Sequence, residues 1–327
     1  MTPPNLVIRD VVVANGLLLA PMESITDRVF RRLIREVGGC GLVATEFIAA
    51  KGLAERHARV MRAAELDPDE HPIAVQVFGR VPAELAEAGR AAVELGADIV
   101  DINMGCPSKK VCHNSGGASL MREPALVREI VSAVRAAVTA PLTVKMRAGW
   151  DETQRNAVEI ARIAEGEGAE AVTVHWRTRE QLYGGERDLR AVRAVKAAVS
   201  IPVIANGDIV DGASALRTLA DTGADGLMVG RGAVKDPFVF RQIEAALHGR
   251  AWTPVSAEER LRLLLRYLDA IRPLFKTDDA ALGRFKKVAR YFCEDVGGDG
   301  ALQLTVLRSP TLPEAVRAIR AKCGDDV

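Results

Sequence analysis

The sequence has no long apolar run and no secretion signal. None of its 327 residues belongs to a run of about 18 consecutive apolar residues, and a helix needs roughly that many to cross a membrane. The first ten residues, MTPPNLVIRD, do not show the basic and then apolar pattern of a secretory signal. We therefore expect a cytoplasmic protein that makes no contact with a membrane.

Cysteine and excess charge are also scarce. The five cysteines are Cys40, Cys106, Cys112, Cys293 and Cys323, and no CxxC pair occurs. A zinc or iron–sulfur site is therefore not expected, and reduced thiols fit this compartment. The chain has 44 Lys and Arg against 43 Asp and Glu, a net charge of +1. A nucleic-acid partner would thus need a local basic surface, because the overall charge offers none.

Short β-type runs alternate with amphipathic helical stretches along most of the chain. The runs cover residues 17–22, 42–47, 73–78, 99–105, 142–149, 171–178, 202–209 and 226–233. Most are almost continuously apolar, which is typical of parallel strands covered on their outer side. Eight repeats of strand and helix predict a (β/α)8 TIM barrel. A doubly wound open sheet is the alternative.

Two segments flank the predicted barrel. In residues 7–16, VIRDVVVANG, the pair Asn15-Gly16 is a turn signal, so we expect a small hairpin that closes the barrel floor. About 90 residues follow the eighth strand, and residues 255–275, 281–296 and 312–323 have helical periodicity. We therefore expect a barrel domain over residues 1–250 and a small all-helical domain over residues 254–327, with a linker around Thr253–Val255.

The ends of the predicted strands carry polar residues and glycines. In a (β/α)8 enzyme the active site lies at the carboxyl ends of the strands. The candidates, in strand order, are Pro21–Glu23, Glu46, Gln76, Asn103 and Cys106, Lys145 and Arg147, His175 and Arg177, Asn206–Asp208, and Gly230–Gly232.

The last two strand ends are the standard phosphate position of such barrels. Asn206, Gly207 and Asp208 follow strand seven, and Gly230 and Arg231 follow strand eight. Glycine lets the backbone come close to an anion, and an arginine adds a charge-assisted hydrogen bond. The alternative is that these glycines only form turns.

Lys145 and Gln76 are expected to point into the same mouth of the barrel. A buried lysine is costly unless it has a partner. The pyrimidine edge of a flavin is one such partner, because it accepts from a cation and pairs with an amide. The alternative is a structural ion pair, for instance with Glu46. His175 could contact a phosphate or a ring, or be an ordinary interior residue.

Cys106 has three interpretations. It could be a small buried hydrophobic residue. It could bind a metal together with Cys112 and His113, although this spacing matches no familiar site. It could also be a catalytic acid or nucleophile at the end of a strand. The residues alone leave the three open.

Segments from all eight strand ends together resemble the tRNA-dihydrouridine synthases. They are APMESITDRVFRRL, TEF, VQVFG, DINMGCPSKKV, VKMRAGW, VHWRT, PVIANGDI and VGRGA. The resemblance extends over residues 18–245, the helical tail also fits, and the string N-x-G-C-P-x-K is specific. The arrangement is most similar to the bacterial B-type members.

The resemblance implies an FMN-dependent barrel with a helical RNA-binding domain. The residues implied to contact the flavin are Pro21, Met22, Glu23, Gln76, Lys145 and His175. Those implied to hold its phosphate are Asn206, Gly207, Asp208, Gly230 and Arg231. By the same resemblance Cys106 is the general acid, Asn103 and Arg177 contact the substrate uridine, and no metal takes part.

The implied reaction has two halves. NADPH reduces FMN, and the reduced flavin gives hydride to C6 of a uracil while Cys106 protonates C5. An acid is needed because negative charge develops at C5, and a free thiol with a pKa near about 8.5 is protonated at neutral pH. The uracil must first be turned out of the tRNA. We expect a monomer to suffice.

Basic residues near the cysteine and in the tail could contact RNA phosphates. Lys109 and Lys110 follow Cys106, and we expect them to point outward, because cations close to the thiol would lower its pKa. In the tail, Arg284, Lys286, Lys287 and Arg290 form a cluster without an acid. Each could equally belong to a solvated helix face.

Two features differ from the family pattern. Trp176 stands where the family usually has glycine, and its ring could stack on the substrate or point into the barrel wall. The loop CHNSGGASL also differs, and Gly116 and Gly117 could let it move between open and closed forms. Neither difference removes a catalytic residue, but both leave open which uridine is modified.

Two other classes of protein share parts of this pattern. A dihydroorotate dehydrogenase-like flavoprotein has the barrel, the FMN and the pyrimidine chemistry, but it would not explain the basic tail or Lys109-Lys110. An RNA-binding protein or chaperone with a vestigial flavin pocket would not need Cys106, Lys145 and Gln76 together.

Overall fold

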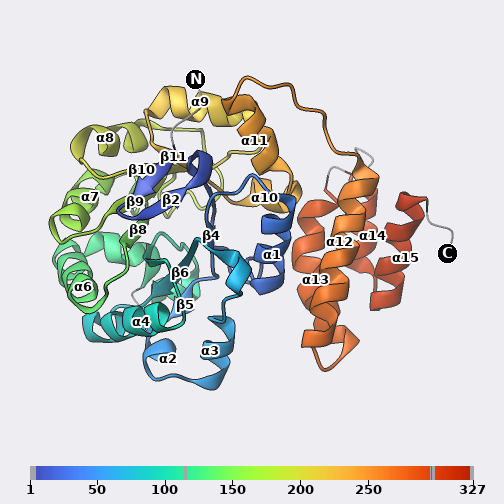
Figure 1. Cartoon of the computed structure of the whole chain (residues 1–327), viewed down its shortest axis with the longest axis horizontal. Helices are drawn as coiled ribbons and strands as arrows, with labels where there is room; N and C mark the ends of the chain where they lie inside the picture. Colours follow the sequence, from blue (N-terminus) through green and yellow to red (C-terminus); the bar gives the residue numbers. More distant parts are fainter. Residues whose placement is uncertain (1–4, 114–115, 295, 297–298, 325–327) are drawn as a thin grey trace.

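A computed structural model describes residues 5–113, 116–294, 296 and 299–324. Its larger part is a ring of parallel strands surrounded by helices, and its smaller part is a group of helices at the carboxyl end of the chain (Figure 1). Within these described ranges, no helix combines the length and the apolar character needed to cross a membrane.

The strands of the larger part form a closed barrel. They are β3 (Leu17–Leu19), β4 (Val43–Ala44), β6 (Ile73–Phe78), β7 (Ile99–Met104), β8 (Leu142–Arg147), β9 (Ala171–His175), β10 (Val203–Asn206) and β11 (Gly226–Val229). Their order is β3-β11-β10-β9-β8-β7-β6-β4, with parallel pairing throughout. A parallel bridge between Leu18 and Leu42 joins the two ends. The predicted barrel is therefore confirmed and the open sheet is excluded.

Helices follow the barrel strands along the chain, as the alternating pattern predicted, and most of them cover the outside of the barrel. They are α1 (Arg28–Val37), α2 (Ala50–Ala54), α3 (Ala58–Ala63), α4 (Pro82–Glu94), α5 (Lys109–His113), α6 (Pro124–Ala137), α7 (Ala157–Gly166), α8 (Arg190–Ala198), α9 (Gly212–Thr222), α10 (Arg231–Lys235) and α11 (Val239–Leu247). The main core lies between strands and helices. Val75, Val100, Val144 and Val172 pack there against the apolar faces of the helices.

A hairpin closes the barrel floor, but its turn is not where the sequence placed it. It consists of β1 (Leu6–Ile8) and β2 (Val11–Val13), so the turn is at Arg9 and Asp10. Asn15 and Gly16 do have the positive φ angles of a turn, 55° and 63°, but they join the hairpin to β3. Apolar side chains of the hairpin pack with those of the strands in a second, smaller core inside the barrel.

The helical tail that the sequence predicted is present. It contains α12 (Ala257–Ile271), α13 (Asp278–Phe292), α14 (Ala301–Arg308) and α15 (Leu312–Cys323). Helix α14 is not predicted from the sequence, because it buries only Leu302 and Val306 and its apolar pattern is weak. We propose that the tail is a domain of its own, beginning near residue 254.

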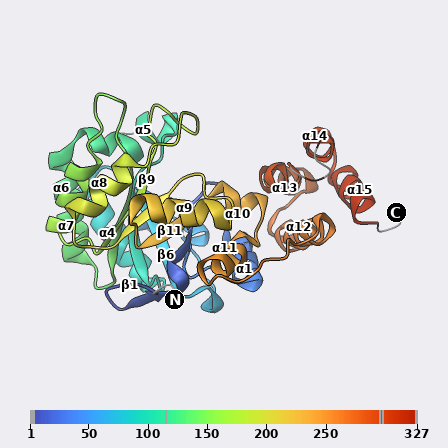
Figure 2. The same ribbon diagram turned by 90° about the horizontal axis from the view of Figure 1, so that it is seen from above.

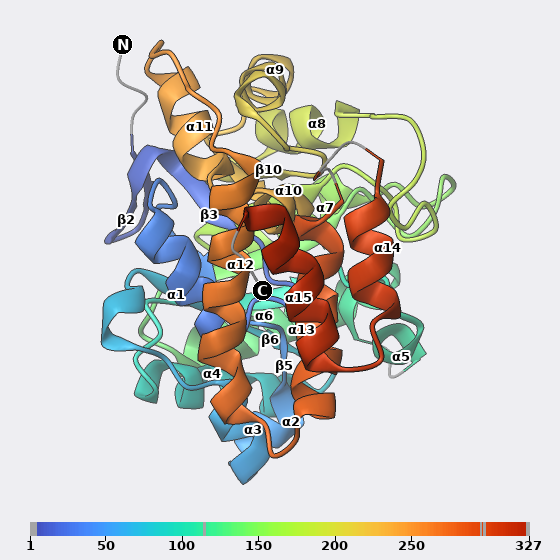
Figure 3. The same ribbon diagram turned by 90° about the vertical axis from the view of Figure 1, so that its right-hand side faces the viewer.

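The tail packs against one side of the barrel. Helix α12 contacts α1, and α13 contacts α10, as seen from above in Figure 2. In Figure 3 the tail faces the viewer with the barrel behind it. The contact includes ion pairs, such as Arg266 with Glu36 at 2.6 Å and Lys235 with Glu294 at 2.9 Å. This packing places α13 and α14 beside the carboxyl ends of the barrel strands.

Candidate active site

A cavity of about 1280 Å³ lies at the carboxyl ends of the barrel strands and reaches the tail. Of the residues that the resemblance assigns to the site, all but Arg177 line it, namely Pro21, Met22, Glu23, Gln76, Asn103, Cys106, Lys145, His175, Asn206, Gly207, Asp208, Gly230 and Arg231. The tail adds Arg290, Tyr291, Glu294, Gln303, Leu304 and Leu307. The barrel and the tail therefore share one site.

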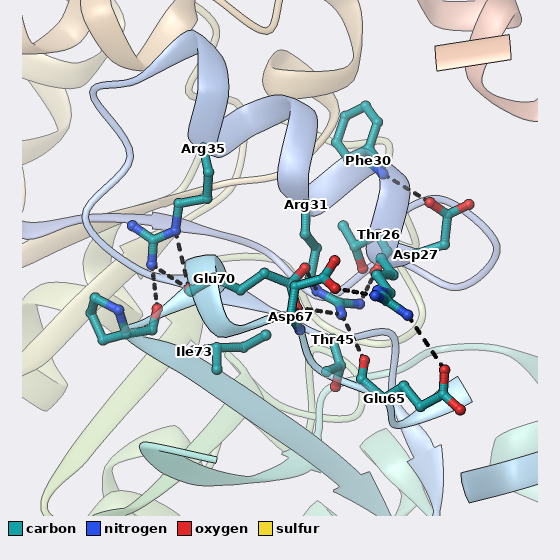
Figure 4. A network of polar contacts seen from close by, with 12 residues as sticks. Thr26, Asp27, Phe30, Arg31, Arg35, Thr45, Glu65, Asp67, Glu70 and Ile73 are labelled. Carbon is teal, nitrogen blue, oxygen red and sulfur yellow. Dashed lines mark hydrogen bonds and ion pairs between the residues drawn. The ribbon is translucent and has the colours of Figure 1, made fainter. Parts of the chain in front are cut away.

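A buried ion pair supports the loop that forms one wall of the cavity. The backbone amide of Met22 donates to Thr26 Oγ1 at 3.0 Å, which closes the loop on itself. Arg31 Nη1 donates to the carbonyl of Thr26 at 3.0 Å, and the same guanidinium makes two bonds of 3.0 Å to Glu70 (Figure 4). Arg31 and Glu70 are each 1% exposed. This pair fixes the loop, since breaking it would leave an unpaired charge in the interior.

The floor of the cavity is a layer of polar side chains inside the barrel. Gln76 lies beside Asp101 in the sheet, and Asn103 lies beside Lys145. Asn103 Nδ2 donates to Gln76 Oε1 at 2.7 Å, and Gln76 Nε2 donates to Asp101 Oδ2 at 2.5 Å. Sequence reasoning missed Asp101. Because alternate residues of a strand share a face, its place two residues before Asn103 was the signal for it.

Lys145 lies at the cavity floor, and no carboxylate of the described residues forms an ion pair with it. Its Nζ donates to Asn206 Oδ1 at 3.0 Å. Burial lowers its pKa to about 8, Arg147 adds to this effect, and Asp101 opposes it. The suggested ion pair with Glu46 is not formed, because Glu46 accepts from Arg284 of the tail at 3.0 Å instead. The ammonium group is thus available to a ligand in the cavity.

His175 is a neutral hydrogen-bond donor at the cavity wall. It is 8% exposed, and burial together with the charges of Arg147, Lys145 and Arg177 lowers its pKa well below 6.5. The backbone amide of Arg177 donates to His175 Nδ1 at 3.2 Å. Since Nδ1 accepts, the proton of the neutral ring is on Nε2.

Cys106 stands where strand β7 ends, with its thiol partly exposed to the cavity. Its backbone amide donates to Asn103 Oδ1 at 2.9 Å. Burial raises the pKa of the thiol above 9.0, so the thiol is protonated at neutral pH. Lys109 and Lys110 are exposed, as expected, although Lys109 also reaches the cavity rim.

The loop after Cys106 carries the second cysteine. Cys112 Sγ donates to the carbonyl oxygen of Cys106 at 3.4 Å. Nowhere in the described ranges do three side chains come together as a metal site would require. Gly117 has a φ of 58°, while Asn114 and Ser115 of the same loop lie outside the described residues.

The turn after β10 is built around a glycine that packing requires. Gly207 has a φ of 117°, and a Cβ atom there would lie 2.5 Å from Nε1 of Trp176. Trp176 is completely buried, and its Nε1 has no hydrogen-bond partner among the described residues. Of the two interpretations of Trp176, the structure supports the barrel wall. The indole sits beneath the turn and does not reach the cavity.

Asp208 joins two arginines at the cavity edge. Arg177 donates to both carboxylate oxygens, at 3.1 and 2.6 Å, and Arg231 Nη2 donates to Oδ1 at 2.9 Å. Arg177 is 4% exposed and also donates to the carbonyl of Gly184 at 2.7 Å. Its guanidinium therefore holds two loops together in the described structure. Its contact with a substrate stays a prediction.

The four basic residues of the tail do not form one surface. Arg284 pairs with Glu46 at 3.0 Å and with Asp27 at 3.3 Å, so it connects the tail to the barrel. Lys286 Nζ donates to the carbonyl of Ser309 at 2.6 Å. Lys287 and Arg290 are exposed, and Arg290 lines the cavity. The clustering of basic residues in the sequence did not show that Arg284 and Lys286 make contacts within the protein while Lys287 and Arg290 are exposed.

The closed barrel and its polar cavity define the protein as a (β/α)8-barrel enzyme. The model of the dihydrouridine synthase (Dus) family matches residues 18–305. The tRNA-dihydrouridine synthase B of Pseudomonas syringae pv. tomato is 44% identical over 266 residues, which cover 80% of this chain and 78% of that protein. A probable tRNA-dihydrouridine synthase of Rhodobacter capsulatus is 50% identical over 237 residues, 72% of each chain. The protein described here belongs to the dihydrouridine synthase family.

A more distant likeness concerns the fold alone. A 2-naphthoyl-CoA reductase in complex with 2-naphthoyl-CoA superposes with a TM-score of 0.58 at 14% identity. The superposition covers 76% of this chain and 52% of that one.

Proposed function

We propose that this protein reduces uridines of tRNA to 5,6-dihydrouridine, with FMN as its bound cofactor and NADPH as the electron donor. The observation that carries the proposal is that the thiol of Cys106 and the amine of Lys145 line the same cavity. Membership of the dihydrouridine synthase family supports it. We also propose that the enzyme acts as a monomer in the cytoplasm, where tRNA is found.

The residues of the cavity fit FMN. Lys145 and the Nε2 proton of His175 offer donors to ring oxygens and nitrogens, and the Gln76 amide keeps one further donor and one further acceptor position. The turn at Gly207 brings backbone close to the cavity, and Arg231 adds a positive charge at the same edge. A flat heterocycle with a phosphate matches this set of groups.

The protein's own contribution to the chemistry is the proton. When bound and reduced, FMN supplies a hydride for C6 of the uracil. Cys106 supplies the proton for C5, where negative charge develops. Because burial raises its pKa, the thiol keeps this proton at neutral pH. Its orientation depends on Asn103, which holds the Cys106 amide.

The substrate side of the cavity includes the tail. A uracil can reach Cys106 only after it leaves the RNA stack, which costs a few kcal/mol. We propose that Lys109, Lys287 and Arg290 offset this cost through contacts with phosphates, since all three are exposed around the cavity or on α13. Asn103 is proposed to contact the uracil from the cavity floor. A direct contact by Arg177 would require its guanidinium to leave Asp208.

Reconstitution with purified components tests the function. The protein is incubated with FMN, NADPH and an unmodified tRNA transcript, and the product is examined by mass spectrometry for a uridine that gains two mass units. We expect this product with the wild type and almost none with Cys106→Ala. Conversion of free orotate without reaction on tRNA would instead favour the dihydroorotate dehydrogenase-like alternative. Binding of tRNA without any product would favour a binding protein.

A further inference from the structure

Asp101 is a buried acid that the chemistry proposed above does not use. It lies in β7 between Gln76 of β6 and Thr143 of β8, and it is 5% exposed. Thr143 Oγ1 donates to Asp101 Oδ1 at 2.6 Å. A buried carboxylate is costly unless it is hydrogen-bonded, so the partners of Asp101 indicate what it does.

A chain of hydrogen bonds runs from Asp101 to the backbone at Cys106. Gln76 Nε2 donates to Asp101 Oδ2 at 2.5 Å, and Asn103 Nδ2 donates to Gln76 Oε1 at 2.7 Å. Asn103 Oδ1 then accepts the backbone amides of Gly105 at 3.0 Å and Cys106 at 2.9 Å. Gln76 is 0% and Asn103 5% exposed, so bulk water cannot easily replace either partner.

The direction of this chain is determined at both ends. A side-chain amide can turn by half a rotation with little change in shape, which exchanges its donor and its acceptor. An ionised Asp101 only accepts, so Gln76 must present its nitrogen there and its oxygen to Asn103. The backbone amides at the other end only donate, so Asn103 must present its oxygen to them. Reversal of either side-chain amide would place two donors or two acceptors opposite each other.

Asp101 also acts on Lys145 of β8, because its negative charge opposes the lowering of that lysine's pKa. Burial raises the pKa of Asp101 to about 6, so the carboxylate is largely ionised at pH 7. It therefore acts as an acceptor at the pH where the enzyme would work.

We propose that Asp101 is a positioning residue whose carboxylate fixes the orientation of the Gln76 and Asn103 amides and thereby holds the backbone at Cys106. The inference rests on the proposed function, because the place of the Cys106 thiol matters only if it delivers a proton. Asp101 itself does not line the cavity.

Backbone hydrogen exchange at Gly105 and Cys106 tests this role directly. In Asp101→Leu the Gln76 amide loses its acceptor, so we expect both amides to exchange about tenfold faster, as for the loss of one buried hydrogen bond. Asp101→Asn keeps an acceptor oxygen but also adds a donor, so a smaller increase of about threefold is expected. Strand β10 serves as the internal reference, and its exchange should not change.

Thr143→Val is the matched control. It removes the other hydrogen bond of the same carboxylate but keeps the charge and the contact with Gln76. Exchange at Cys106 should stay within about twofold of the wild type. For dihydrouridine formation we expect kcat to fall most in Asp101→Leu, less in Asp101→Asn and least in Thr143→Val, with the KM for tRNA unchanged.

Two results would overturn the proposal. One is unchanged exchange at Gly105 and Cys106 in Asp101→Leu, or in Asp101→Asn if the leucine variant does not fold. The other is equally faster exchange in β10, which would mean general loosening of the barrel. A wild-type protein that forms no dihydrouridine would contradict the proposed function, while the exchange rates would still decide the role of Asp101.

Discussion

Replacing Lys145 with methionine should stabilise the flavin-free protein while weakening its binding of flavin. Burial lowers the pKa of this lysine from 10.5 to about 8. A tenfold change in proton affinity corresponds to about 1.4 kcal/mol, so the ammonium group costs up to about 3 kcal/mol of folding free energy. Loss of the hydrogen bond to Asn206 reduces this gain in folding free energy by about 1 kcal/mol. The net gain is about 2 kcal/mol, or a rise in Tm of roughly 4 °C.

The gain in stability from Lys145→Met should become smaller as the pH rises. The folded protein holds the Lys145 proton less tightly than the unfolded chain, so the unfolded chain binds more protons between pH 8 and 10.5. Wild-type stability therefore has a contribution that rises with pH across this window. Methionine does not titrate. The advantage of Lys145→Met is then full at pH 7, where the lysine is charged in both states, and shrinks as the pH approaches 10.5.

Thermal unfolding of the flavin-free proteins at pH 7 and pH 10 measures both effects. Lys196→Met is the matched control, because Lys196 pairs with Asp225 at the surface, at 2.7 Å, and should give no gain in Tm. The reasoning is refuted if Lys145→Met lowers the Tm at pH 7. It is also refuted if the difference from the wild type is the same at both pH values.

Other substitutions separate the remaining roles. Cys106→Ala should keep flavin colour and tRNA affinity but lower dihydrouridine formation at least about 100-fold, and an unchanged yield by mass spectrometry would exclude the thiol as the acid. Gly207→Ala places a Cβ atom 2.5 Å from Trp176 Nε1, so a loss of about 1–3 kcal/mol in chemical unfolding and weaker flavin binding are expected; normal values would contradict the tight turn. Arg284→Gln should lower the stability of the tail–barrel contact, measured by unfolding, whereas Lys287→Gln should leave stability unchanged and reduce the salt dependence of tRNA binding. Equal effects of these two variants would argue against their separate roles.

The barrel could be predicted because its signal is local and repeated. Each strand is a short apolar run followed by a polar or glycine-rich end, so eight repeats fixed both the architecture and the edge on which the site lies. The predicted position of the turn in the floor hairpin was wrong, because turn propensity is also a local signal. Asn15 and Gly16 do adopt turn angles, but local propensity does not tell which turn joins paired strands.

Contacts between distant residues could not be predicted from the sequence. Arg284 belongs by sequence to a basic cluster, yet its partners Asp27 and Glu46 are more than two hundred residues away. Whether the ring of Trp176 lies in the barrel wall or in the cavity depends on its packing beneath the turn at Gly207, which the local sequence does not show. Asp101 was within reach of strand periodicity, but its role depends on the direction of hydrogen bonds between side chains of different strands.

Mass spectrometry of tRNA from cells that lack this protein tests the central claim most directly. Dihydrouridine should be missing from at least one tRNA position, and that uridine should be lighter by two mass units than in the parent cells. Expression of the wild-type chain should restore the mass, whereas expression of Cys106→Ala should not. Full dihydrouridine at every tRNA position in the absence of the protein, in cells without a second family member, would contradict the account.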